Sequence, residues 1–196
     1  MSKQLIRDRI REQRRRLSPR QQRLAADNLS RRLHAQLFFQ RARVVAFYLA
    51  NDGEIDPTPL MGRALKAGKT VCLPVLDPHR PGHLVFVPWK PGGRLQPNRF
   101  GIPEPPLLGA TRIRWWQLDV VFMPLVGFDR FGNRLGMGGG FYDRTLGPYR
   151  QRARPLLIGL AHHFQQVAAV EADNWDVPLD GAATDRAFTF FHHRRG

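Results

Sequence analysis

The sequence predicts one α/β domain spanning residues 1–196, a three-layer α/β/α arrangement with a mostly parallel sheet and two amphipathic helices at its N-terminus. Three observations lead to this fold class. Short apolar runs alternate with helical patterns, the length suits one continuous core, and neither repeats nor a linker-like tract interrupts the chain.

Both N-terminal helices have an apolar face. The first carries a stripe at helical spacing: Ile6, Ile10 and Leu17. The second is expected to bury Ala26, Leu29, Leu33 and Leu37. Ser18 is a typical N-cap, Pro19 suits the first helical position, and Gln21 completes a capping box, so the second helix should start here. Most arginines of both helices are expected on a solvated face.

Buried strands follow the helices. The predicted strands cover residues 44–49, 70–73, 84–87, 120–123, 156–160 and 187–191. A helix from about Asp56 to Gly68 separates the first two strands, which makes a βαβ unit and favours parallel pairing. Residues 91–113 are rich in Gly and Pro and are expected to form a long ordered loop.

Three segments should meet at one edge of this sheet. In open α/β sheets, ligands bind beyond the carboxyl ends of the strands. The turn at 51–56, the loop after Met123 and the stretch after Leu160 all fall there, and His162 or His163 is a candidate to touch a substrate. The segment 192–195 is expected to be an exposed, frayed tail.

The charge of the chain is strongly positive. The formal net charge is +15, and residues 1–43 contribute 13 Lys and Arg against three acids. Such a balance favours polyanionic partners, either nucleic acid or a small anionic ligand. No apolar run approaches the roughly 20 residues that a membrane span needs. The single cysteine, Cys72, excludes an internal disulfide, is expected in the core, and fits a cytoplasmic protein.

The most informative segment is the glycine-rich loop at 124–143. Closely spaced glycines let backbone N–H groups approach an anion, Arg134 adds a positive charge, and Asp143 can bind Mg²⁺. The loop lacks the Gly-Lys-Ser/Thr of a Walker A motif, and Phe141 stands where a Rossmann fingerprint needs its third glycine. A phosphate-binding loop of another type is therefore predicted.

The motif at 133–143, Asn-Arg-Leu-Gly-x-Gly-x-Gly-Phe-Tyr-Asp, resembles the signature of the 5-formyltetrahydrofolate cyclo-ligase family. Three further motifs match that family in order: Lys-x-x-Ile-Arg at 3–7, Gly-Ile-Pro-Glu-Pro at 101–105 and Asp-Val-Pro-Leu-Asp at 176–180. The resemblance implies a cytoplasmic enzyme, favoured as a monomer, that uses ATP and Mg²⁺ to convert 5-formyltetrahydrofolate into 5,10-methenyltetrahydrofolate, ADP and phosphate.

The resemblance also implies roles for individual residues. ATP would contact Lys3, Arg7, Arg134, Leu135, Gly136, Met137, Gly138, Gly139, Gly140, Phe141 and Tyr142. Folate would contact Leu49, Glu54, Met137, Gly138, Gly139, Gly140 and Phe141. Arg134 and Tyr142 would be catalytic, and Asp143 and Asp176 would hold Mg²⁺.

The chain departs from the family within the glycine loop. Many members carry Arg and Lys where this sequence has Met137 and Gly139, so two phosphate-facing charges would be absent. Surplus arginines elsewhere in the chain are candidates to replace them.

Two other functions are considered. A nucleic-acid-binding module would use the arginine-rich helices, but residues 1–36 contain no Phe, Trp or Tyr to stack on bases. A different phosphate-ligand enzyme on a similar scaffold, such as a sugar-phosphate isomerase or an acyl-CoA transferase, would need a carboxylate at the sheet edge, which Glu54 could supply.

Overall fold

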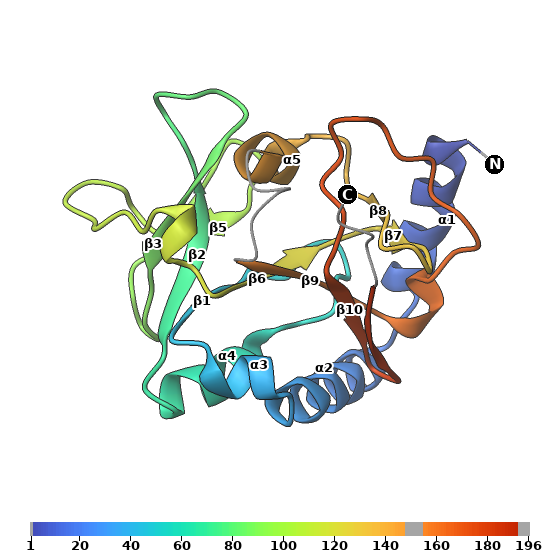
Figure 1. The fold of residues 1–196 in the computed structure, drawn as a ribbon, viewed down its shortest axis with the longest axis horizontal. Helices are drawn as coiled ribbons and strands as arrows, with labels where there is room; N and C mark the ends of the chain where they lie inside the picture. The colour runs from blue at the N-terminus through green and yellow to red at the C-terminus, as the bar shows by residue number, and fades with distance from the viewer. Residues whose placement is uncertain (1, 148–154, 192–196) are drawn as a thin grey trace.

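A seven-stranded sheet runs through the middle of the computed structural model, which describes residues 2–147 and 155–191 (Figure 1). The strand order is β11-β10-β9-β6-β1-β2-β3. The strands are β1 (Val44–Ala46), β2 (Thr70–Leu76), β3 (Leu84–Pro88), β6 (Val120–Pro124), β9 (Leu156–Ala161), β10 (Gly181–Thr184) and β11 (Phe188–Phe190). The five central strands pair in parallel, and only β3 and β11 pair antiparallel at the edges. The predicted mostly parallel sheet is confirmed.

Helices cover both faces of this sheet. They are α1 (Lys3–Arg15), α2 (Pro19–His34), α3 (Leu37–Arg41), α4 (Thr58–Lys66) and α5 (Phe141–Leu146). Figure 1 shows α2, α3 and α4 along one face and α5 on the other, with α1 beside the small β7 (Gly127–Phe128) and β8 (Arg134–Leu135) hairpin. The predicted three-layer arrangement is therefore confirmed. No helix in the described ranges is long and apolar enough to cross a membrane.

The hydrophobic core is divided by the sheet. Val45, Phe47 and Phe122 point toward the layer of α2 and α4, whereas the alternate residues Ala46 and Met123 pack on the opposite side. Because side chains alternate across a strand, each central strand is buried on both faces. Cys72 is among these buried residues, as predicted, and burial raises its pKa to about 12. A thiol in this environment stays protonated and unreactive.

The start of α2 was predicted correctly. The Ser18 hydroxyl accepts a hydrogen bond from the Gln21 backbone N–H, and the Gln21 side chain accepts one from the Ser18 N–H at 2.8 Å. The end of the helix was predicted wrongly. Helix α2 stops at His34, and Leu37 begins the separate helix α3 with 64% of its surface exposed. Phe39 is buried instead, because the chain turns between the two helices.

Several short elements were not predicted. The strand β10 has the sequence Gly-Ala-Ala-Thr, which lacks the bulky apolar side chains that mark the other strands. The predicted loop at 91–113 contains a small hairpin, β4 (Gln96–Pro97) with β5 (Pro103–Glu104). Residues 192–195, the expected frayed tail, lie outside the described residues.

The order of the strands creates a switch point. From β1 the chain crosses through α4 to β2 on one side, whereas from β6 it continues to β9 on the other side. The loops that leave the carboxyl ends of β1 and β6 therefore diverge and open a crevice between them. The turn at 51–54 and the glycine loop border this crevice.

Candidate active site

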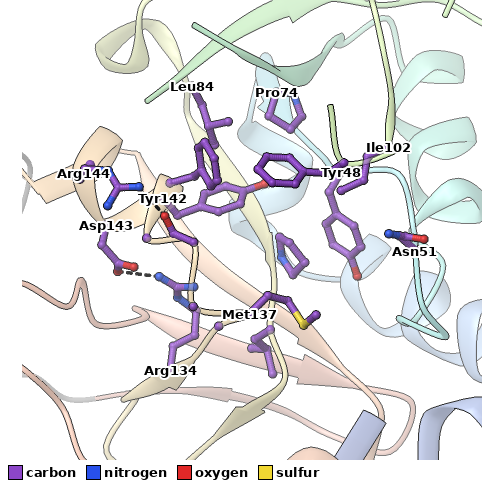
Figure 2. Close-up of a pocket in the computed structure, with 18 of the residues that line it drawn as sticks. Tyr48, Asn51, Pro74, Leu84, Ile102, Arg134, Met137, Tyr142, Asp143 and Arg144 are labelled. Carbon is purple, nitrogen blue, oxygen red and sulfur yellow. Dashed lines mark hydrogen bonds and ion pairs between the residues drawn. The ribbon is translucent and has the colours of Figure 1, made fainter. Parts of the chain in front are cut away.

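A cavity of about 1120 Å³ lies at the carboxyl ends of β1 and β6 (Figure 2). Its walls come from α1, the loop after β1, strands β2 and β3, the β4–β5 hairpin, the glycine loop with α5, and the segment 173–176. Its volume exceeds the range typical for drug-sized ligands, so it has room for a large substrate or for two substrates side by side.

Every site residue implied by the family resemblance lines this cavity. They are Lys3, Arg7, Leu49, Glu54, Arg134, Leu135, Gly136, Met137, Gly138, Gly139, Gly140, Phe141, Tyr142, Asp143 and Asp176. These residues come from four separate segments of the chain, so the fold itself brings them together. His162 and His163 do not line the cavity. His162 is buried, which lowers its pKa to about 4, and its Nε2 lies 3.3 Å from the Gly53 carbonyl oxygen.

The glycine loop has a backbone that other residues rarely adopt. Gly138 and Gly140 have φ angles of 92° and 63°, in the left-handed region that glycine tolerates without strain. A Cβ atom at Gly139 would lie 2.9 Å from the ring of Phe141. The loop therefore presents bare backbone toward the cavity, as a phosphate-binding loop does.

Two arginines hold this loop in place. Arg7 of α1 donates from Nε to the Gly136 carbonyl oxygen at 2.9 Å. Arg144 of α5 donates to the carbonyl oxygen of Gly139 and, at 3.0 Å, to that of Gly82. Both side chains line the cavity, so the loop lies between two positive charges. Arg144 was not selected from the sequence, because it stands one residue after the motif that ends at Asp143.

Arg134 and Asp143 form an ion pair in the cavity wall. The Arg134 Nη2 to Asp143 Oδ1 distance is 2.6 Å, and the Val177 backbone N–H donates to the same oxygen at 3.1 Å. The Arg134 side chain is only 6% exposed, and its Nε has no hydrogen-bond partner within the described residues. A buried donor without a partner in a cavity wall suits an anionic ligand, because such a group is costly to leave unsatisfied.

The segment 173–176 closes one side of the cavity. Asp176 accepts a hydrogen bond from the Asp173 backbone N–H at 2.9 Å, and Lys3 forms an ion pair with Asp173 at 2.6 Å. The hydrogen bond from Asp173 raises the pKa of Lys3, so this side chain is a cation at neutral pH. Within residues 2–147 and 155–191, no three His, Cys, Asp or Glu side chains gather as a metal site. Asp143 and Asp176 are thus two carboxylates on one cavity rather than a closed protein cage.

Glu54 lies on the other side of the cavity, at the end of the turn that follows β1. Its carboxylate accepts a hydrogen bond from the Asn51 backbone N–H at 3.1 Å. Burial raises the pKa of Glu54 to about 7, although the Asn51 hydrogen bond and the Arg14 charge act in the opposite direction. Nearby Tyr142 also has a raised pKa, first because it is buried and second because Glu54 is close. Its hydroxyl therefore stays protonated at neutral pH.

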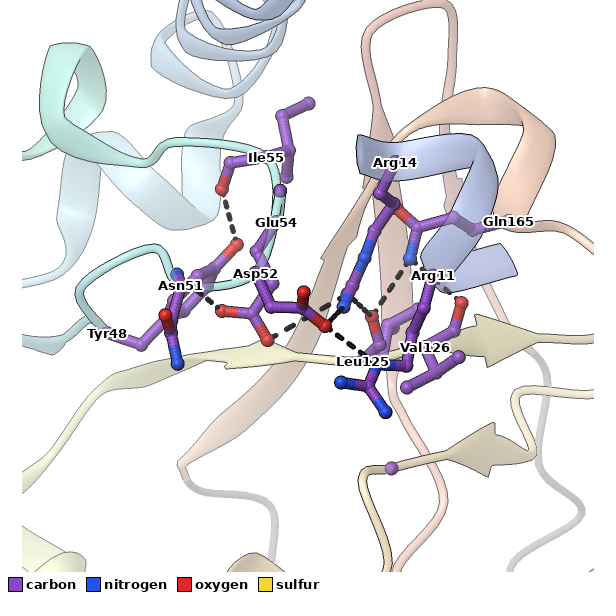
Figure 3. A network of polar contacts seen from close by, with 12 residues as sticks. Arg11, Arg14, Tyr48, Asn51, Asp52, Glu54, Ile55, Leu125, Val126 and Gln165 are labelled. Atoms are coloured by element: carbon purple, nitrogen blue, oxygen red, sulfur yellow. Dashed lines mark hydrogen bonds and ion pairs between the residues drawn. The ribbon is translucent and has the colours of Figure 1, made fainter. Parts of the chain in front are cut away.

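The sequence failed to identify Arg14. Most arginines of the first two helices were expected on a solvated face, but Arg14 is fully buried, and its guanidinium lies near Asp52 and Glu54 (Figure 3). Its position offered a signal. Counting from Ile10, Arg14 is one helical turn further along the same stripe, so it points toward the core with the apolar residues.

The comparisons with known proteins decide the family. A model of the 5-formyltetrahydrofolate cyclo-ligase family matches residues 1–185. The chain is 41% identical over 175 residues to the 5-formyltetrahydrofolate cyclo-ligase of Escherichia coli strain K12. The alignment covers 89% of this chain and 96% of that relative. The chain belongs to the 5-formyltetrahydrofolate cyclo-ligase family. The Haemophilus influenzae cyclo-ligase is similar at 39% identity over 177 residues, covering 90% of this chain and 94% of that relative.

Solved structures agree with the assignment to the cyclo-ligase family. The NMR structure of the Aquifex aeolicus 5,10-methenyltetrahydrofolate synthetase superposes with a TM-score of 0.83 at 30% identity, covering 100% of this chain and 96% of that chain. The Mycoplasma pneumoniae 5,10-methenyltetrahydrofolate synthetase shares the fold, with a TM-score of 0.75 at 23% identity. The superposition covers 94% of this chain and 99% of that chain. The resemblance found in the motifs is confirmed, and the chain is an enzyme of the cyclo-ligase type.

Proposed function

We propose that this enzyme closes 5-formyltetrahydrofolate to 5,10-methenyltetrahydrofolate, using ATP and Mg²⁺ and releasing ADP and phosphate. One observation supports this most strongly. A single cavity holds a cationic glycine loop and a carboxylate pair on one side and a buried glutamate on the other. An enzyme that transfers a phosphoryl group to a nitrogen heterocycle needs both kinds of surface within reach of each other.

The nucleotide would bind along the glycine loop. Lys3, Arg7 and Arg134 provide the positive charges, and the backbone at 135–140 approaches the phosphates closely because it carries few side chains. The unpartnered Nε of Arg134 gains an acceptor when a phosphate oxygen lies beside it. Arg144 adds a further charge on the loop, where the sequence has Met137 and Gly139 instead of basic residues.

Asp143 and Asp176 would hold Mg²⁺. The ion prefers oxygen ligands and is commonly bound by one or two carboxylates together with substrate phosphates. Two carboxylates that line one cavity fit this donor set. When bound, Mg²⁺ would neutralise charge on the phosphate oxygens. Arg134 keeps Asp143 oriented through their 2.6 Å ion pair.

The folate would occupy the side of Glu54. An ionised Glu54 accepts hydrogen bonds from the amino and ring N–H groups of a pterin, and Leu49 and Met137 offer apolar contacts to the ring system. Its raised pKa, about 7, means that part of the enzyme carries a neutral Glu54 at neutral pH. Folate recognition by this residue should therefore improve as the pH rises through 7.

The reaction requires positioning more than acid–base chemistry. The formyl oxygen on N5 attacks the γ-phosphorus and ADP leaves. N10 then attacks the formyl carbon and loses its proton, and the C–O bond breaks to release phosphate. Arg134 would stabilise negative charge on the transferred group, and Tyr142, which is adjacent to the loop and to Glu54, would orient the formyl group through its protonated hydroxyl.

Coupling between the two substrates tests this proposal. ADP release from ATP should require 5-formyltetrahydrofolate, because the formyl oxygen is the phosphoryl acceptor. The measurement is ADP formation with and without the folate, with 5-methyltetrahydrofolate as the control that lacks a formyl oxygen. ADP release at the same rate with all three samples would contradict the proposal.

A further inference from the structure

Arg14 is an unusual residue in the site described above. A guanidinium that is 0% exposed has lost its hydration, so its partners must compensate for a large desolvation cost. Its Nε has no hydrogen-bond partner within the part of the chain that the structure describes. A buried ion pair generally stabilises a fold no more than well-packed apolar side chains would. The charge of Arg14 therefore indicates a role in the site rather than in stability.

The partners of Arg14 are two carboxylates from one turn. Its Nη2 donates to Asp52 Oδ2 at 3.2 Å, and its Nη1 lies 3.9 Å from Glu54 Oε1 and 3.5 Å from the Leu125 carbonyl oxygen. Asp52 also accepts a hydrogen bond from Arg11 at 2.7 Å (Figure 3). It accepts another from Arg15 at 2.6 Å. Burial acts to raise the pKa of Asp52, but the bonds from Arg15 and Arg11 outweigh it, so this pKa is below its usual range.

Helix α1 packs directly on this turn. Gly53 has a φ of 72°, and a Cβ atom there would lie 3.0 Å from the main chain of Arg14. Asp52 has a φ of 50°, so the turn bends tightly beneath the helix. Gln22 donates to the Gly53 carbonyl oxygen at 3.2 Å, which fixes the turn from α2. The direction in which Glu54 points into the cavity therefore depends on the packing of α1 against residues 52 and 53.

We propose that Arg14 is a positioning residue for Glu54: it favours the ionised carboxylate and keeps it directed into the cavity. The proposal rests on the folate-binding role proposed for Glu54 and adds a residue that does not itself touch the ligand. Arg14 shares α1 with Lys3 and Arg7, so one helix supports both the nucleotide side and the folate side of the cavity.

The charges around Glu54 determine in which direction its pKa should change when each neighbour is replaced. Arg14 from α1 lowers the pKa of Glu54, whereas Asp52 from the same turn raises it. Tyr48 after β1 and Tyr142 of α5 also lie near Glu54, and both hydroxyls are neutral because burial raises their pKa values. Removing Arg14 should therefore raise the Glu54 pKa, and removing the charge of Asp52 should lower it.

The test is a carboxyl titration by ¹³C NMR with labelled glutamate. The sequence contains only four glutamates, Glu12, Glu54, Glu104 and Glu171, and Glu54→Gln assigns the relevant signal. We expect Arg14→Met to raise the Glu54 pKa by about one unit or more, since an opposite charge within 4–6 Å shifts a pKa by roughly one to three units. Asp52→Asn should shift it downward, and asparagine tolerates the left-handed backbone at this position.

Matched variants separate positioning from packing. Arg14→Lys retains the charge and should keep the Glu54 pKa close to that of the parent enzyme. Arg15→Gln removes an arginine that also binds Asp52 but is 58% exposed, and it should leave the titration nearly unchanged. In activity assays, Arg14→Met should raise the folate KM below the shifted pKa, with recovery at higher pH and a smaller change in the ATP KM.

The outcomes are distinct. Unchanged Glu54 titration in Arg14→Met and Asp52→Asn, or shifts in the same direction in both, would overturn the proposal. If Arg14→Met does not fold, the other two variants test the proposal. The Glu54 pKa should then be lower in Asp52→Asn and unchanged in Arg14→Lys, and any other result would overturn the proposal. The titration needs no substrate, so it remains informative even if the parent enzyme makes no product from 5-formyltetrahydrofolate, a result that would count against the proposed function alone.

Discussion

Arg134 and Asp143 are nine residues apart, and their 2.6 Å ion pair joins β8 to the first turn of α5 across the glycine loop. Only Oδ1 of Asp143 takes part in the hydrogen bonds to Arg134 and Val177. The carboxylate is thus fixed at one oxygen while it lines the cavity. This arrangement suits a metal-binding carboxylate that must be oriented before Mg²⁺ and nucleotide arrive.

Replacing Asp143 with Asn should weaken the use of MgATP. The variant keeps the shape but loses the charge, and a hydrogen bond to a charged group is worth about 1.5–3 kcal/mol, which corresponds to roughly tenfold or more in the KM for MgATP. Steady-state kinetics with varied Mg²⁺ check this, and the folate KM should change much less. Asp27→Asn on the exposed face of α2 is the control. Equal Mg²⁺ dependence in Asp143→Asn and the parent enzyme would remove the assigned role.

Replacing Glu54 with Gln should chiefly raise the folate KM. The amide cannot accept as many hydrogen bonds from a pterin, and it does not titrate. In the parent enzyme, kcat/KM for folate should rise as the pH increases through about 7, because Glu54 then becomes ionised. The variant should lose this rise of kcat/KM with pH. If the rise persists in Glu54→Gln, another group is responsible for it.

The same residue should affect stability. The folded-state pKa of Glu54, about 7, lies above its ordinary value of 4.5, so the folded protein binds a proton that the unfolded chain releases. The contribution of Glu54 to stability is therefore largest at low pH and is lost as the pH rises from about 4.5 to about 7. The stability of Glu54→Gln relative to the parent should increase between about pH 5 and pH 8, on the order of 1–3 kcal/mol. Urea unfolding at both pH values measures it, and a constant difference would argue against the raised pKa.

Replacing Arg144 with Gln should impair nucleotide use. Arg144 connects the Gly139 and Gly82 carbonyl oxygens and places a charge on a loop that has Met137 and Gly139 at the positions where many family members carry Arg and Lys. The KM for MgATP should rise about tenfold, in line with the value of a charge-assisted hydrogen bond. Arg144→Lys should retain more of the affinity. If both variants match the parent enzyme, Arg144 has no part in nucleotide binding.

The fold was largely predictable because its central strands are short, apolar and separated by clear helix signals. Ser18, Pro19 and Gln21 marked the start of α2 correctly because capping is a local property. Leu37 was misplaced because the end of α2 depends on a chain turn without a strong local signal. Strand β10 was missed because its small residues fit between β9 and β11, and that packing is visible only in the tertiary structure.

The candidate site was predictable where residues form a continuous motif. The glycine loop could be recognised as one segment, whereas Arg14, Asp52 and Arg144 depend on contacts between distant elements. Asp52 looked like an ordinary turn residue, because the sequence does not show that three arginines of α1 converge on it. Spacing along α1 contained the clue to Arg14, but an arginine-rich helix hides one inward-facing member among many exposed ones.

The proposed reaction is tested most directly by an absorbance assay for 5,10-methenyltetrahydrofolate with the purified chain, 5-formyltetrahydrofolate and MgATP. We expect product formation that stops when ATP is omitted or when EDTA removes Mg²⁺. We also expect one ADP for each product molecule. No product from a folded sample that binds nucleotide, or product that forms equally well without ATP, would contradict the proposed reaction.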